Sequence, residues 1–185
     1  MIDKIINEAK NAVVAATKGA GDILTALETT VKDIVMKTIK DAGEVTEGTV
    51  DMLAHVTKGA VMGLSGTATS VETGTTQVAS GAVKGLSEVG GDVIHGIKSI
   101  VSGAIQGASE VGGDVAQTAV SAVTGVIKTA GQVGVDATDA TKSAVGGAVE
   151  AADKIGGEVG KDIKEALMDV ASIPRELITS AFKGN

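Results

Sequence analysis

The chain contains no cysteine, no tryptophan and no tyrosine, and its single phenylalanine is Phe182. Without cysteine the chain has neither disulfides nor thiolate metal sites. Large aromatic side chains normally fill much of a globular core. The Ala- and Val-rich apolar surfaces of this chain must therefore pack with their backbones close together. Because 43% of the residues are hydrophobic, the composition is not that of a fully disordered tail.

Positive charge and long apolar runs are also scarce. The net charge is -7, which argues against nucleic-acid binding through phosphates and against attraction to anionic lipid headgroups. The longest runs without a charged residue, 59–71 and 115–127, have 13 residues, whereas a transmembrane helix needs about 20. Charges also interrupt the first ten residues, unlike in a signal peptide. We expect a cytoplasmic protein, at most peripheral to a membrane or lipid surface.

A repeat of 22 residues dominates what the sequence does contain. Residues 80–101 and 102–123 are identical at 13 of 22 positions. Three further blocks, which begin at positions 58, 124 and 146, keep the same frame less strictly, so five blocks cover 58–167. Repetition at a fixed period is a primary signal of how a chain is organised.

Apolar residues recur within each block at steps of three and four, which predicts helix rather than strand. Each block contains two weaker units of 11 residues, and this period keeps an apolar stripe nearly parallel to the axis of a helix. The predicted apolar face consists of Val61, Val83, Val93, Ile105, Val115, Ile127, Val149 and Val159.

Glycine occupies the second position of every block, and in three blocks it recurs four residues later. This GxxxG spacing lets another backbone approach one flank of the apolar face closely. In helices, the 21 glycines of 58–167 cost on the order of 20 kcal/mol relative to alanine. Packing against another part of the chain, another copy or a lipid surface must offset this cost. The predicted helix-packing stripe consists of Gly59, Gly63, Gly81, Gly85, Gly103, Gly107, Gly125 and Gly147.

Adjacent glycines lie inside the motif SEVGGDV, which occurs at 87–93 and again at 109–115. We interpret most of the repeat region as continuous helix, and the alternative is a set of helices broken at glycine pairs such as these. The predicted fold class is all-α, with long Gly/Ala/Val-rich amphipathic helices that pack as a hairpin or bundle within a larger assembly.

Three segments follow from the composition. Residues 1–57 are predicted to form an N-terminal amphipathic helical segment, and 58–167 contain the five repeats. A Thr- and Gly-rich stretch at 65–80 is the best candidate for a hinge. Residues 168–185 are predicted to form a short C-terminal helix and tail, in which a helix start tolerates Pro174.

No residues in the sequence predict a catalytic, cofactor or metal site, and an enzyme is not expected. His55 and His95 are far apart in the chain, and neither has neighbours at metal-ligand spacing. Asp92 and Asp114 recur with the repeat, and we interpret them as part of a solvated polar face. The stretch GGEVGKD at 156–162 departs from a phosphate loop, because no Ser or Thr follows its lysine and no strand precedes it.

The 11-residue rhythm resembles three families of amphipathic-helix proteins. The stretches KGAVMGL and KGLSEVGGDV are similar in style to the KTKEGV-like units of synucleins. Perilipins use Thr- and Gly-containing 11-residue units, and group 3 late-embryogenesis proteins use Ala-, Lys- and Glu-rich ones. The chain lacks the KTKEGV core and has fewer charges than the late-embryogenesis repeats. The resemblance implies an amphipathic surface-binding helix and no catalysis.

We therefore expect a non-enzymatic structural protein that self-assembles through glycine-lined helices into a bundle, filament or tube. A repeating surface can meet copies of itself in register, so the expected partner is the chain itself. The first alternative is a peripheral protein that coats a neutral lipid droplet, granule or vesicle. A stress protectant, disordered in water and helical when dry, is less favoured, and no nucleic-acid partner is expected.

Overall fold

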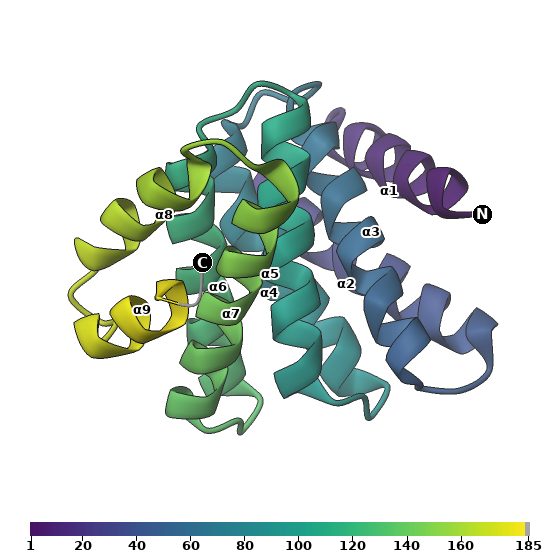
Figure 1. Cartoon of the computed structure of the whole chain (residues 1–185). Coiled ribbons are helices and arrows are strands. Elements are labelled where there is room, and N and C mark those ends of the chain that lie inside the picture. Colours follow the sequence, from purple (N-terminus) through teal and green to yellow (C-terminus); the bar gives the residue numbers. More distant parts are fainter. Residues whose placement is uncertain (184–185) are drawn as a thin grey trace.

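The computed structural model describes residues 1–183, and within them the protein is all-α, with nine helices and no strand (Figure 1). The helices are α1 (Ile2–Thr17), α2 (Ile23–Ala42), α3 (Glu47–Leu64), α4 (Val71–Glu88), α5 (Val93–Glu110), α6 (Val115–Gln132), α7 (Ala137–Ile155), α8 (Val159–Met168) and α9 (Arg175–Phe182). This agrees with the predicted fold class, although the helices are much shorter than expected.

Each 22-residue repeat forms one helix and one turn. The helices α4, α5 and α6 have 18 residues each, and they begin 22 residues apart at Val71, Val93 and Val115. The interpretation of the repeat region as continuous helix is therefore wrong, because the chain reverses direction after every helix. One 18-residue helix and its four connecting residues make 22 residues. This equals two of the 11-residue units in the sequence, so the repeat length alone does not distinguish a continuous helix from a helix followed by a turn.

The glycine pair of SEVGGDV ends one helix. Gly90 has φ of 71°, in the left-handed region that side chains disfavour. Its N–H donates to the carbonyl oxygen of Ser87 at 3.0 Å, and the N–H of Gly91 donates to that of Leu86 at 2.9 Å. These two bonds are those of a Schellman motif, and they satisfy carbonyl groups that the last turn of α4 leaves free.

The aspartate of the same motif begins the next helix. The side chain of Asp92 accepts a hydrogen bond from the backbone N–H of His95 at 3.1 Å, and Asp114 accepts one from Gln117 at 3.0 Å. Such N-caps satisfy backbone donors that have no partner within the helix. Both aspartates are exposed, as expected for residues of a solvated polar face. Their side-chain oxygens also fix the start of α5 and of α6, a role that the sequence interpretation did not include.

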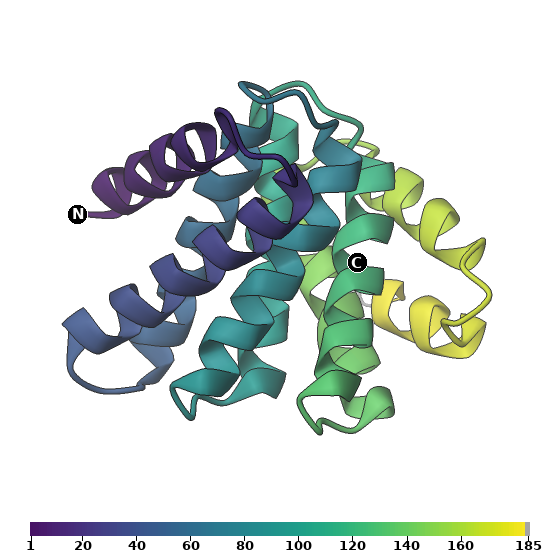
Figure 2. The ribbon, with the colours of Figure 1, turned by 180° about the vertical axis from the view of Figure 1, so that it is seen from behind.

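The helices form two layers. The odd-numbered helices α1, α3, α5 and α7 form one layer, and α2, α4, α6 and α8 form the other, as the views from the two sides show (Figures 1 and 2). The most extensive contacts join helices two apart in the chain, namely α1–α3, α2–α4, α3–α5, α4–α6 and α5–α7. The layers are therefore built from neighbours of the same direction, while consecutive helices pack across them.

The apolar core lies between the layers and consists of aliphatic side chains. Its largest fully buried members include Leu27, Leu53, Leu64, Leu86, Ile97, Ile100, Ile105, Ile163, Leu167 and Ile178. The helices at the two ends of the chain, α1 and the pair α8–α9, lie on opposite sides of the molecule (Figure 1).

Two predicted boundaries differ from the structure. The boundary between 1–57 and 58–167 lies inside α3, and the first segment contains α1, α2 and the first part of α3. The candidate hinge at 65–80 is a loop only over residues 65–70, because a side-chain cap by Ser70 starts α4 at Val71. Pro174 is the residue directly before α9, while residues 184–185 lie outside the described part.

Candidate functional site

The predicted glycine stripe lies where each helix meets the helix two before it. A Cβ atom at Gly81 would lie 2.3 Å from the backbone oxygen of Glu28, and one at Gly103 would lie 2.1 Å from that of Ala54. Glycine alone permits so close an approach of two backbones. The other six would place a Cβ 2.2–3.0 Å from a backbone oxygen: Gly59 (Ile6), Gly63 (Lys10), Gly85 (Lys32), Gly107 (Lys58), Gly125 (Thr76) and Gly147 (Lys98).

All eight glycines thus pack within the chain. The sequence left three partners open for the stripe, and the structure places another part of the same chain against it. One helix provides the glycines, and the helix two before it provides the carbonyl oxygens, so α3, α4 and α5 have both kinds of surface. The contact recurs at the five steps from α1–α3 to α5–α7.

Lys–Glu ion pairs cross the same interfaces. Lys84 Nζ lies 2.5 Å from Glu28 Oε1, next to the contact that Gly81 makes. The other pairs are Lys32–Glu88 at 3.0 Å, Lys98–Glu150 at 3.2 Å and Lys58–Glu110. These pairs are partly exposed, so each contributes modestly to stability.

Glu150 has the most elaborate of these environments. Burial raises the pKa of its carboxyl, but hydrogen bonds from Lys154 and Lys98 outweigh burial and hold the pKa below its ordinary value. The hydroxyl of Ser102 in α5 also donates to Glu150 Oε1 at 3.3 Å. The carboxylate therefore joins α5 to α7 as an anion.

The predicted apolar face lies mostly between the layers. Val61, Val83, Val93 and Ile105 are buried, whereas Val115, Ile127, Val149 and Val159 are half-buried. The large apolar side chains that stay exposed in residues 1–183 are Met1, Ile2, Val45 and Ile94. The folded chain therefore presents little of its apolar face to the outside.

Consecutive helices also make a close contact, between a leucine and a glycine, that was not predicted from the sequence. A Cβ at Gly96 would lie 2.0 Å from Leu86 Cδ2, so the leucine at the end of α4 occupies the space beside α5 that glycine leaves free. Gly74 has the same relation to Leu64. In the next repeat Ala108 takes the position of Leu86, and Thr118 takes the position of Gly96. The residue at the end of the first helix is therefore smaller there, and its counterpart in the following helix is larger. This paired change between aligned repeats was the available signal.

The histidines have different surroundings. His55 is half-buried, and burial, followed by the charge of Lys58, lowers its pKa. His95 is exposed, with Nδ1 2.5 Å from Asp92 Oδ2. Across residues 1–183 no three acidic or histidine side chains converge as metal ligands would. Most of GGEVGKD, at 156–162, forms the turn before α8 and its first residues, and Glu158 does not cap that helix with its side chain.

The comparisons with known proteins establish only the fold. No protein-family model and no curated protein matches the chain. Among solved structures it is similar to a de novo designed helical repeat protein, DHR7, with a TM-score of 0.56 and 18% identity over 99% of this chain and 97% of the other. The chain therefore has the fold of a helical repeat protein. In the part that the structure describes, no helix combines the length and the apolarity needed to cross a membrane.

Proposed function

We propose that the chain is a non-enzymatic structural protein, a helical-repeat scaffold that assembles with further copies of itself. The observation that carries this proposal is the repeated glycine-to-carbonyl contact. The helices α3, α4 and α5 each have one surface that presents glycines and another that accepts them, so the middle of the protein is built from a self-complementary unit. The stack does not close on itself, and its two ends lie apart on opposite sides of the molecule (Figure 1).

Charged residues at one end favour a closed assembly over an open filament or tube. Asp33 and Lys37 of α2 occupy the positions that Gly81 and Gly85 occupy in α4, because Asp33 lies five residues after Glu28 as Gly81 lies five residues after Thr76, and the backbone oxygens of Glu28 and Thr76 make the same contact. A helix could not approach these side chains as closely as α3 approaches α1. Terminal repeats with a polar outer face are typical of repeat proteins that stop growing. We therefore propose a particle of fixed copy number.

Coating of a neutral lipid surface remains the second proposal, but it requires a change of structure. Because most of the apolar face lies between the two layers, a lipid surface would have to separate the layers to reach it. Lipid binding would then compete with the interhelical contacts of the folded chain.

Light scattering during size-exclusion chromatography, over a hundredfold range of concentration, tests the first proposal. We expect a discrete mass that is a multiple of the 18.2 kDa chain. A single-chain mass at every concentration would contradict self-assembly. Flotation with triacylglycerol droplets tests the second proposal, and co-flotation accompanied by faster amide exchange in the core helices α4 and α5 would support it.

A further inference from the structure

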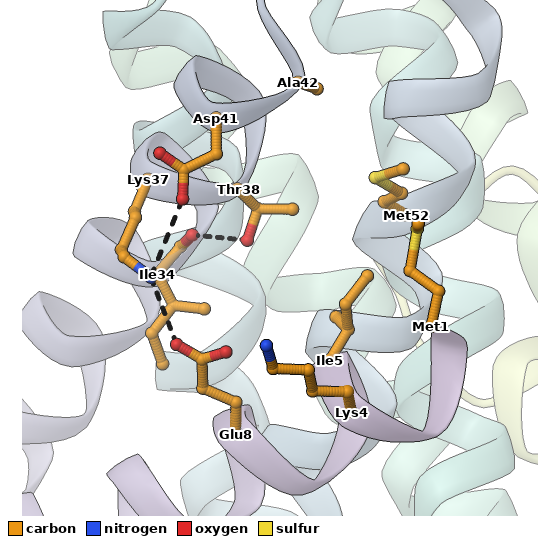
Figure 3. Close-up of a pocket in the computed structure, with 10 residues that line it drawn as sticks. All are labelled: Met1, Lys4, Ile5, Glu8, Ile34, Lys37, Thr38, Asp41, Ala42 and Met52. Carbon is orange, nitrogen blue, oxygen red and sulfur yellow. Dashed lines mark hydrogen bonds and ion pairs between the residues drawn. The ribbon is translucent and has the colours of Figure 1, made fainter.

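A groove lies at the N-terminal end of the stack, between α1 and α2 (Figure 3). It has a volume of about 440 Å³, and Met1, Ile5, Ile34 and Met52 contribute its apolar lining. Met1 is 93% exposed and the neighbouring Ile2 is 52% exposed. Two of the four exposed large apolar side chains in residues 1–183 thus lie at this end.

The groove adjoins a side of α2 that has no partner helix. In α3 to α7, the glycine side of each helix faces the helix two before it. The equivalent residues of α2 are Asp33 and Lys37, because Asp33 lies five residues after Glu28 as Gly81 lies five residues after Thr76, and the backbone oxygens of Glu28 and Thr76 make the same contact. Within the described residues no helix lies two before α2, so this side of α2 is unpartnered, and Lys37 on it lines the groove.

We propose that this groove docks against the same groove of a second copy, about a two-fold axis. The inference rests on the proposed function of self-assembly and names the surface that carries it. A two-fold contact is self-complementary and closes at two copies. It would cover Met1 and Ile5 of each chain with the apolar lining of the other chain's groove.

The charges of the groove suit a contact with itself. Lys37 Nζ lies 3.2 Å from Glu8 Oε1 and 3.6 Å from Asp41 Oδ2 (Figure 3). Lys4 also lines the groove, and it forms no ion pair within residues 1–183. The two lysines balance the two acidic residues, so two copies meet without net repulsion. Lys4 of each copy is available to the acidic side chains of the other.

A head-to-tail contact, which would continue the stack, fits less well. At Gly59 even a Cβ would lie 2.2 Å from the backbone oxygen of Ile6. The equivalent position of α2 is Asp33, so a helix from another copy cannot take the regular place beside α2. A two-fold contact does not require that close approach.

Ala42→Arg tests the proposal without removing a core side chain. Ala42 is exposed and lines the groove, and an arginine at the end of α2 suits the helix dipole. We expect the variant to keep the helical circular dichroism of the wild type and to dissociate into single chains at concentrations at least tenfold higher. Gln132→Arg, at the exposed last residue of α6 and outside the groove, is the matched control and should assemble like the wild type, because its arginine also lies at a helix C-terminus.

Cysteine cross-linking distinguishes the two geometries, since the natural chain has no cysteine. With a short bis-maleimide, Lys4→Cys alone should give cross-linked dimers, because a two-fold axis brings the two grooves together. Cross-links that form only when Lys4→Cys is mixed with Lys161→Cys, at the other end, would overturn the two-fold arrangement. If the wild type assembles and Ala42→Arg does so equally, the groove is not the interface; if the wild type is always a single chain, the proposed function fails as well.

Discussion

Gly146 and Gly147 are neighbours in α7 with opposite surroundings. A Cβ at Gly147 would lie 2.4 Å from the backbone oxygen of Lys98, whereas one at Gly146 would meet no heavy atom within 4 Å. Glycine is therefore required by contact at one position and only lowers helix propensity at the next. The pair separates the two roles of glycine within a single turn of helix.

Alanine substitutions at these two positions should change stability in opposite directions. Gly147→Ala should lower the free energy of unfolding by roughly 2–3 kcal/mol, because α7 must move away from α5. Gly146→Ala should raise it by about 0.5–1 kcal/mol through better helix propensity. Urea unfolding followed by circular dichroism measures both. Equal effects of the two substitutions would show that the close approach of the backbones is unimportant.

The contact between Leu86 and Gly96 predicts that two substitutions in the next repeat compensate for each other. Ala108→Leu should destabilise the chain by about 1–3 kcal/mol, because the equivalent of Gly96 is the larger Thr118. Thr118→Gly in the same chain restores the Leu and Gly pair of the preceding repeat and also removes a buried hydroxyl that has no hydrogen-bond partner.

A double-mutant cycle measures that compensation. We expect the double variant to be more stable than the sum of the two single effects by about 1–2 kcal/mol. Additive effects would mean that these two positions do not face each other as their equivalents Leu86 and Gly96 do.

The N-cap of α6 predicts a local dependence on one side-chain oxygen. Asp114→Ala should cost about 1 kcal/mol, since the N–H of Gln117 loses its acceptor. Asp114→Asn keeps an acceptor oxygen and should retain most of the stability. Thermal unfolding of the three chains tests this, and the idea fails if the asparagine variant is as unstable as the alanine variant.

The environment of Glu150 predicts a dependence of stability on pH. Its pKa in the folded chain is below the ordinary 4.5, so its charged form stabilises the fold. That contribution is present above the ordinary value and is lost as the pH falls through the lowered folded value. Glu150→Gln should therefore have a lower melting temperature than the wild type at pH 7, and the difference should shrink towards pH 3. Glu165→Gln, at an exposed glutamate of α8, is the control and should track the wild type.

The sequence predicted the helices and the glycines that pack, but not where the helices end. Steps of three and four reveal a helix whether it spans 18 residues or 100, so periodicity could not show the breaks. The decisive signal was local: in SEVGGDV a glycine suited to a left-handed C-cap lies two residues before an aspartate suited to an N-cap. The partner of the stripe and the fit of Leu86 to Gly96 depend on tertiary packing, which one repeat by itself does not encode.

The likeness of the two layers means that such a stack can lengthen by one helix at a time. Each repeat contributes one helix, and successive helices point in opposite directions and join opposite layers. Duplication of a single 22-residue repeat would reverse every later helix and move it to the other layer, but each would still pack against the helix two before it through the same kind of contact. A single repeat is therefore a sufficient unit of duplication, which agrees with the 13 identical positions of the adjacent repeats 80–101 and 102–123.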